Sequence, residues 1–177
     1  MPTPLQTAVL TQQANPYPGA LIASSALASL NTTGTVAVAS VGLRAGLVVS
    51  NITVLVGTTA GVAMTHQWAA LTDSTLTVKA VSADGTSGAL PGSTLKTYAM
   101  GSPFTVPATG VYYLAVSVTA TTAPTLAGVT PAGAASGLVP VLCGTAGSQS
   151  APPSLAAQLA SGVVTFNGSM NFAAWVS

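Results

Sequence analysis

Charged side chains are almost absent from this sequence of 177 residues. Three basic and two acidic residues give a net charge of +1, whereas about a quarter of the residues in a typical soluble domain are charged. Three separated cations form no basic patch, so nucleic-acid binding driven by phosphate contacts is not expected. Disorder is not expected either, because it combines low hydrophobicity with high net charge, and 49% of these residues are hydrophobic.

Cysteine and long apolar runs are also scarce. Cys143 is the single cysteine, which rules out an intrachain disulfide, and no Cys/His spacing indicates a zinc site. The most apolar span, residues 36–56, contains Arg44, Asn51 and many Gly and β-branched residues, which argues against a membrane helix of about 20 apolar residues. No basic segment precedes residues 19–30, so a secretory signal is not expected. We predict no metal, no other cofactor and no membrane partner.

From Thr35 onward, apolar and polar residues alternate with a period of two. The alternation is clearest in Asn51–Val56, Thr75–Val81 and Val111–Thr119, and it is typical of strands with one buried face. Thr and Val favour this structure because β-branched side chains fit a pleated surface. The apolar faces of these strands predict the following core residues: Ile52, Val54, Leu76, Val78, Leu114, Val116 and Val118.

The pattern weakens beyond Pro124. Leu138–Cys143, Val163–Phe166 and Phe172–Val176 are candidate strands, and Ser154–Ser161 is a candidate for one or two helical turns. Eight to ten short strands separated by turns predict an all-β fold: an antiparallel β-sandwich, jelly-roll-like.

The first 34 residues differ from the rest. Pro2, Pro4, Pro16 and Pro18 oppose regular structure. We interpret residues 1–34 as an extended N-terminal docking arm and residues 35–177 as the β-sandwich domain; a first strand followed by a loop is the alternative for the arm. Its predicted anchoring residues are Leu5, Val9, Leu10 and Tyr17.

The candidates for catalysis are few. His66 is the single histidine, and Asp73 or Asp84 could orient it, but no Gly-x-Ser-x-Gly elbow supplies a nucleophile. Both aspartates lie in predicted turns, where Asp commonly bonds the local backbone. A glycosidase needs two carboxylates on one site, and this arrangement does not predict one. We expect that the protein is not an enzyme.

Aromatic side chains offer a second kind of site. Trp68 precedes small residues and is predicted to lie in the core. Tyr98 and Tyr113 are candidate exposed rings for stacking on a glycan. Tyr113 lies on the face of its strand opposite to Leu114, which is why exposure is expected.

Five segments resemble small virion proteins of tailed actinobacteriophages; they are Gly46–Thr53, Gly57–Ala60, Thr65–Leu71, Phe104–Leu114 and Ala123–Gly128. The resemblance implies a minor tail, fibre or head-decoration protein and no catalytic residues. A nearly uncharged chain lacks the charge that keeps free domains apart, which agrees with permanent assembly.

We therefore expect a non-enzymatic structural protein on the virion surface, most simply a capsid decoration protein attached through its N-terminal arm. Its expected partners are copies of itself, for example in a trimer, and the major capsid or tail proteins, with no nucleic acid. The alternative is a minor tail or fibre protein, or an adhesin that binds host cell-wall glycans.

Overall fold

A computed structural model describes residues 12–13, 26–29, 34–86, 88–128, 141, 143–159, 162–166 and 172–177. In these residues the regular structure consists of antiparallel strands, and no helix is present. The all-β antiparallel prediction is therefore confirmed. Within the same ranges, no helix is long and apolar enough to cross a membrane.

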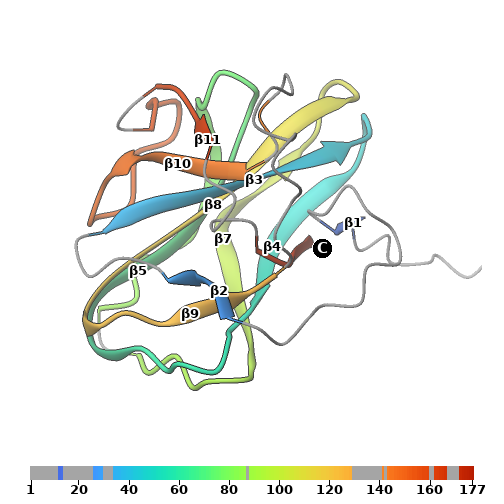
Figure 1. Cartoon of the computed structure of the whole chain (residues 1–177). Coiled ribbons are helices and arrows are strands. Elements are labelled where there is room, and N and C mark those ends of the chain that lie inside the picture. Colours follow the sequence, from blue (N-terminus) through green and yellow to red (C-terminus); the bar gives the residue numbers. More distant parts are fainter. Residues whose placement is uncertain are drawn as a thin grey trace, which may run out of the picture.

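The strands form two larger sheets and one short ribbon (Figure 1). The six-stranded sheet has the spatial order β11 (Thr165–Phe166), β10 (Cys143–Ser148), β3 (Thr35–Leu43), β8 (Gly110–Thr122), β5 (Val62–Thr72) and β6 (Val78–Val81). The four-stranded sheet has the order β1 (Gln12–Gln13), β12 (Ala174–Val176), β4 (Val48–Leu55) and β7 (Leu95–Thr105). The ribbon pairs β2 (Ala26–Ser29) with β9 (Thr125–Ala127).

Four of the strand pairings are nested in the sequence. The strand β5 pairs with β6, and outside this pair β4 pairs with β7, β3 with β8, and β1 with β12. The chain thus runs out and back like one long hairpin. Folding that hairpin over brings β12 beside β4 and β5 beside β8, which completes the two sheets.

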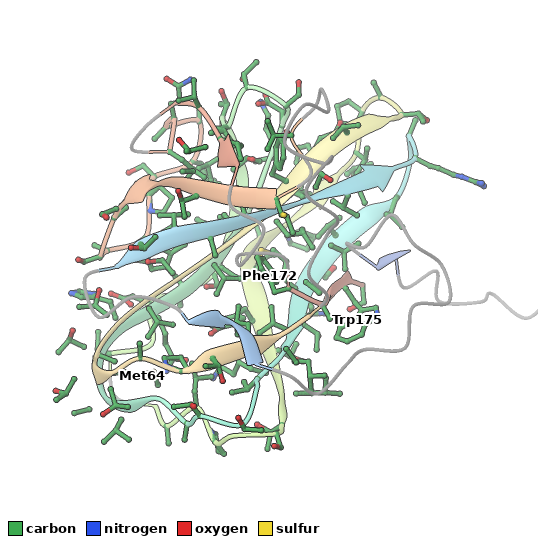
Figure 2. The ribbon with its side chains drawn as sticks, viewed as in Figure 1. Met64, Phe172 and Trp175 are labelled. Atoms are coloured by element: carbon green, nitrogen blue, oxygen red, sulfur yellow. The ribbon has the colours of Figure 1, made fainter. Side chains whose placement is uncertain are left out.

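The two larger sheets face each other across one hydrophobic core, here called the between-sheet core. It contains Ile52 and Val54 from β4 and Leu114, Val116 and Val118 from β8, all fully buried. These five predictions are confirmed. Phe172, labelled in Figure 2, belongs to the same core and is 1% exposed.

The six-stranded sheet is buried on its other face as well. Trp68, Leu76, Val78 and Tyr113 form a second cluster there with Ala115, and Leu159 from the loop that follows β10 covers it. Leu76 and Val78 are buried as predicted. They belong, however, to this second cluster, here called the outer core, and not to the between-sheet core. The protein therefore has two cores where a single one was expected.

Several predicted elements differ in extent. Thr75–Val81 becomes a strand only at Val78, because Leu76 has a φ of 63° and cannot continue an extended chain. Only Cys143 of the candidate strand Leu138–Cys143 lies in a strand, and residues 138–140 and 142 lie outside the described ranges. The predicted helical turns at Ser154–Ser161 are wrong for the described residues: Ala157 N–H donates to the Ser154 carbonyl (3.2 Å) in a single tight turn.

Two strands lie inside the predicted docking arm. The strand β1 pairs with β12, with Gln12 opposite Val176, and β2 pairs with β9. Both segments thus pair with strands from the later part of the chain. The division at residue 34 stays a prediction. Leu5, Val9, Leu10 and Tyr17 lie outside the described residues.

Candidate functional site

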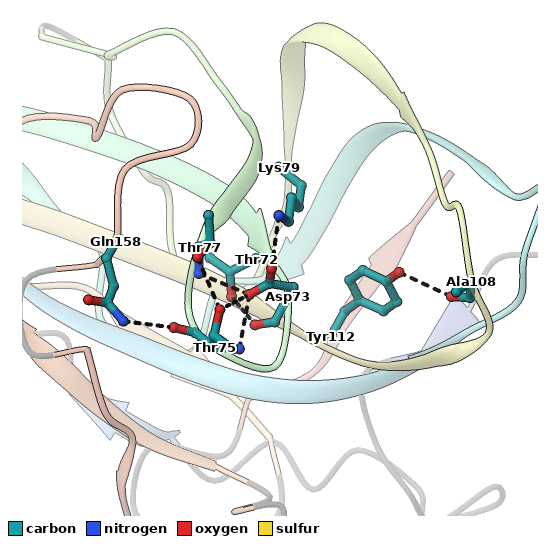
Figure 3. Close-up of polar contacts among 8 residues, drawn as sticks. All are labelled: Thr72, Asp73, Thr75, Thr77, Lys79, Ala108, Tyr112 and Gln158. Atoms are coloured by element: carbon teal, nitrogen blue, oxygen red, sulfur yellow. Dashed lines mark hydrogen bonds and ion pairs between the residues drawn. The ribbon is translucent and has the colours of Figure 1, made fainter.

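Asp73 organises the turn between β5 and β6 (Figure 3). Its Oδ1 accepts hydrogen bonds from the Thr75 hydroxyl (2.6 Å) and from the backbone N–H groups of Thr75 (2.9 Å) and Thr77 (3.1 Å). Its Oδ2 lies 2.8 Å from Lys79 Nζ. Both oxygens of this carboxylate have partners within the turn or on Lys79, so Asp73 serves the turn, as the sequence predicted.

The electrostatics of Asp73 agree with this role. Partial burial raises the pKa of the carboxyl, but the hydrogen bonds from Lys79, Thr75 and Thr77 outweigh burial and lower it from 3.8 to about 2. The ionised form is the one that the turn binds. A general acid would need the opposite shift.

A hollow of about 740 Å³ lies beside this turn and is lined by Asp73, Leu76, Tyr112 and Val163, among others. Tyr112 donates its O–H to the Ala108 carbonyl (3.1 Å; Figure 3), and Tyr113 donates to the Val141 carbonyl (2.9 Å). The polar groups named here are thus occupied by the protein itself. The hollow offers mainly apolar surface.

His66 and Asp84 are brought together by the fold. His66 Nδ1 lies 2.6 Å from Asp84 Oδ2, and Asp84 Oδ1 accepts from the Gln67 N–H (3.2 Å). The aspartate therefore orients the imidazole and also fastens the segment after β6 to β5. Among the described residues, His66 Nε2 has no hydrogen-bond partner, and in particular no hydroxyl is bonded to it.

The expectation that Tyr98 and Tyr113 expose their rings is wrong. Tyr98 is 5% exposed and Tyr113 is 3% exposed. Tyr98 faces the between-sheet core, and Tyr113 points to the opposite face of its sheet, as predicted, but that face is covered by the outer core. Neither ring can stack on a sugar in this conformation. Trp68, predicted to be buried, is fully buried, and its Nε1–H donates to the Ser150 carbonyl (2.8 Å).

Gln67 and Lys96 form part of a cleft that sequence reasoning missed. The cleft has a volume of about 230 Å³ and lies between β5, the segment that follows β6, and β7. It is lined by Gln67, Ser82, Asp84, Gly85, Lys96 and Tyr98. A side chain at Gly85 would place its Cβ 2.5 Å from Gln67 Cγ, so this close approach requires glycine. No local motif marks such a site, because its residues come from three separate segments.

No group of three or more His, Cys, Asp or Glu side chains in the described ranges could hold a metal ion. Burial raises the pKa of the Cys143 thiol to about 11, which keeps it in the weakly nucleophilic thiol form. No protein-family model, curated protein or solved structure matches the chain.

Proposed function

We propose that this chain is a structural, non-enzymatic protein of the outer surface of a tailed-phage virion, with a jelly-roll-like sandwich as its body. The nested strand pairing supports the jelly-roll description. Eight strands in two facing sheets, β1-β12-β4-β7 and β3-β8-β5-β6, follow from rolling up one long hairpin. Jelly rolls occur in viral capsid proteins and in lectins.

The observation that carries the proposed structural role is that both aspartate carboxylates, of Asp73 and Asp84, are bonded to other groups of the protein. Asp73 is occupied by its own turn and Lys79, and Asp84 by His66 and the Gln67 backbone. Both acids therefore stabilise the fold itself. The resemblance described above and the scarcity of charge support a place in a permanent assembly.

Uncharged exposed side chains favour assembly through apolar contact. Val62, Leu95, Leu155 and Val163 are each more than half exposed. Burying such side chains against copies of the chain or against a capsid or tail protein would be favourable, at about 25 cal/mol per Å² of apolar surface. We propose a homo-oligomer held on the particle by these contacts and by residues 1–11, which precede β1.

The test uses purified virions of the phage that produces this chain. Electron cryomicroscopy of intact particles is expected to locate it on the outside of the head in ordered copies. Density on the tail instead would select the minor tail or fibre alternative. Its absence from purified virions would contradict the proposal.

Attachment is tested with a chain that starts at Gln12. This truncation keeps β1 and its pairing with β12, so the fold is expected to survive. We expect this chain to bind poorly to particles that lack the native protein. Binding at normal occupancy would show that residues 1–11 are not needed.

A further inference from the structure

Two residues that line the cleft between β5 and β7, Gln67 and Tyr98, each carry a buried polar atom without a partner. Neither Gln67 Oε1 nor the Tyr98 hydroxyl oxygen makes a hydrogen bond, although both are closed off from solvent. Buried polar groups are normally satisfied, and an unsatisfied one destabilises the folded state. Two in one small cleft form a feature that the strand pairing and the core do not explain.

The orientation of the Gln67 amide is fixed by its neighbour. Its Nε2 donates to the Gly88 carbonyl (3.2 Å). Turning the amide over would place Oε1 against that carbonyl, where two acceptors would repel each other. Oε1 therefore remains an open acceptor.

The other polar groups of the cleft are already in use. The Ser82 hydroxyl accepts from the Ala69 N–H and donates to the Ala83 carbonyl. Both oxygens of Asp84 are engaged by His66 and by the backbone. The open positions are the Gln67 acceptor, the Tyr98 hydroxyl and the ammonium of Lys96. Burial raises the pKa of Tyr98 well above its ordinary value, so its hydroxyl stays a donor.

We propose that this cleft binds a small neutral polyhydroxyl molecule of about the size of one sugar ring. Neighbouring hydroxyls both donate and accept, so one can donate to Gln67 Oε1 while the next accepts from Tyr98. The volume of about 230 Å³ is below the roughly 300–1,000 Å³ of pockets for drug-sized ligands. This inference does not depend on the proposed place of the protein in a virion.

The charges at the cleft favour a neutral ligand. Lys96 and Asp84 both line it, so an anionic ligand would approach the Asp84 carboxylate and a cationic ligand the Lys96 ammonium. Lys96 Nζ lies 5.4 Å from the centre of the Tyr98 ring and covers it. Ligand entry therefore requires the Lys96 side chain to swing out, which a flexible lysine on the edge strand β7 can do.

The experiment measures amide chemical shifts of the full chain during titration with galactose, N-acetylglucosamine and glycerol, each up to tens of millimolar. Gluconate and glucosamine are the anionic and cationic comparisons. We expect at least one neutral probe to shift the signals of Gln67, Gly85 and Thr97 in a saturable way. The charged probes should bind more weakly.

Tyr98→Phe is the decisive variant, because it removes one unpartnered hydroxyl and keeps the ring. It should weaken binding about three- to tenfold, as expected for one hydrogen bond, while the unfolding midpoint in urea stays equal or rises. Tyr112→Phe is the matched control, because its hydroxyl donates to Ala108 away from the cleft. It should lower the unfolding midpoint and leave binding unchanged.

Lys96→Met tests whether Lys96 only covers the Tyr98 ring or also contacts the ligand through its ammonium group. The methionine side chain keeps the packing over the ring but carries no charge. It should retain binding of a neutral sugar within a few-fold. The proposal is overturned if no probe shifts these signals, if Tyr98→Phe binds as well as the native chain, or if a structure determined with the sugar present shows ordered waters alone on Gln67 Oε1 and Tyr98.

Discussion

At the scale of single residues, one carboxylate, that of Asp73, stabilises a whole turn of this nearly uncharged protein. Asp73 binds three donors of its own turn as well as Lys79. Leu76 lies within this turn, between Thr75 and Thr77, with a left-handed φ of 63°. Its side chain is buried in the outer core. A costly backbone conformation is thus held by one carboxylate and one buried leucine.

The ionisation of Asp73 should contribute to stability. Its pKa is lowered from 3.8 to about 2 on folding, so the contribution is present above the unfolded pKa and is lost as the pH falls through the folded pKa. After allowance for solvent screening at this half-buried position, about 1 kcal/mol is expected. Measuring urea unfolding of the native chain and Asp73→Asn should show a gap near neutral pH that narrows toward pH 2. A constant gap would contradict the assignment.

Leucine truncations should separate core from surface. Leu76 is 1% exposed and Leu114 is 0% exposed, so replacing either by Ala should cost about 2–5 kcal/mol in the free energy of unfolding. Leu95, 64% exposed, is the control, and Leu95→Ala should change stability by about 0.5 kcal/mol or less. Losses below that at both buried positions would mean that the two cores are not closely packed.

At the scale of elements, the segment after β10 is the cover of the six-stranded sheet. It contributes Leu159 to the outer core. Its backbone also bonds to β6, since Val78 N–H donates to the Ala157 carbonyl (2.9 Å) and Ala156 N–H to the Val78 carbonyl (3.0 Å). These bonds also occupy the outer edge of β6 at Val78. An edge that would otherwise offer unpaired backbone groups is covered there.

Trp68 links this cover to β5 through the Ser150 carbonyl. Trp68→Phe should leave that carbonyl unpaired and a small cavity in the outer core, at a cost of about 1–3 kcal/mol. Hydrogen exchange should become faster for residues 146–159 than for β4. Trp175→Phe is the control, because Trp175 (labelled in Figure 2) is half-buried and belongs to neither core. Equal effects of the two variants would argue against Trp68 as the link.

At the scale of the whole molecule, the nested pairing joins the two ends of the chain. The strand β1 lies beside β12, so residues near both termini share one edge of the four-stranded sheet (Figure 1). Contacts this distant in sequence form against a large loop-closure entropy and are expected to make folding slow.

The pairing of β1 with β12 and of β2 with β9 should therefore contribute measurably to the free energy of unfolding. A chain that starts at Thr35 lacks both strands, whereas a chain that starts at Gln12 keeps them. The shorter chain is expected to lose a few kcal/mol, at about 1 kcal/mol for each backbone hydrogen bond. Thermal and urea unfolding of the two chains test this. Equal midpoints would mean that the two strands add nothing to the fold.

The sequence by itself determined the fold class, the inward faces of β4 and β8, and the turn at Asp73. Alternation fixes which residues share a face whatever the sheet packs against, and an aspartate in a short turn bonds its own backbone. The same rule missed β3 and β5. Strands buried on both faces need not alternate, and residues 36–43 are almost continuously apolar.

Only the tertiary structure decided that the second face of the six-stranded sheet is buried, which placed Tyr113 inside. It also brought Gln67, Asp84 and Lys96 to one cleft and paired His66 with Asp84. The local sequence pattern indicates to which face of its strand a side chain points, but it does not indicate whether that face is covered by another segment. The cover comes from the loop after β10, whose Leu159 lies 46 residues further along the chain than Tyr113. The apolar residues of this loop are too few and too small to signal a core.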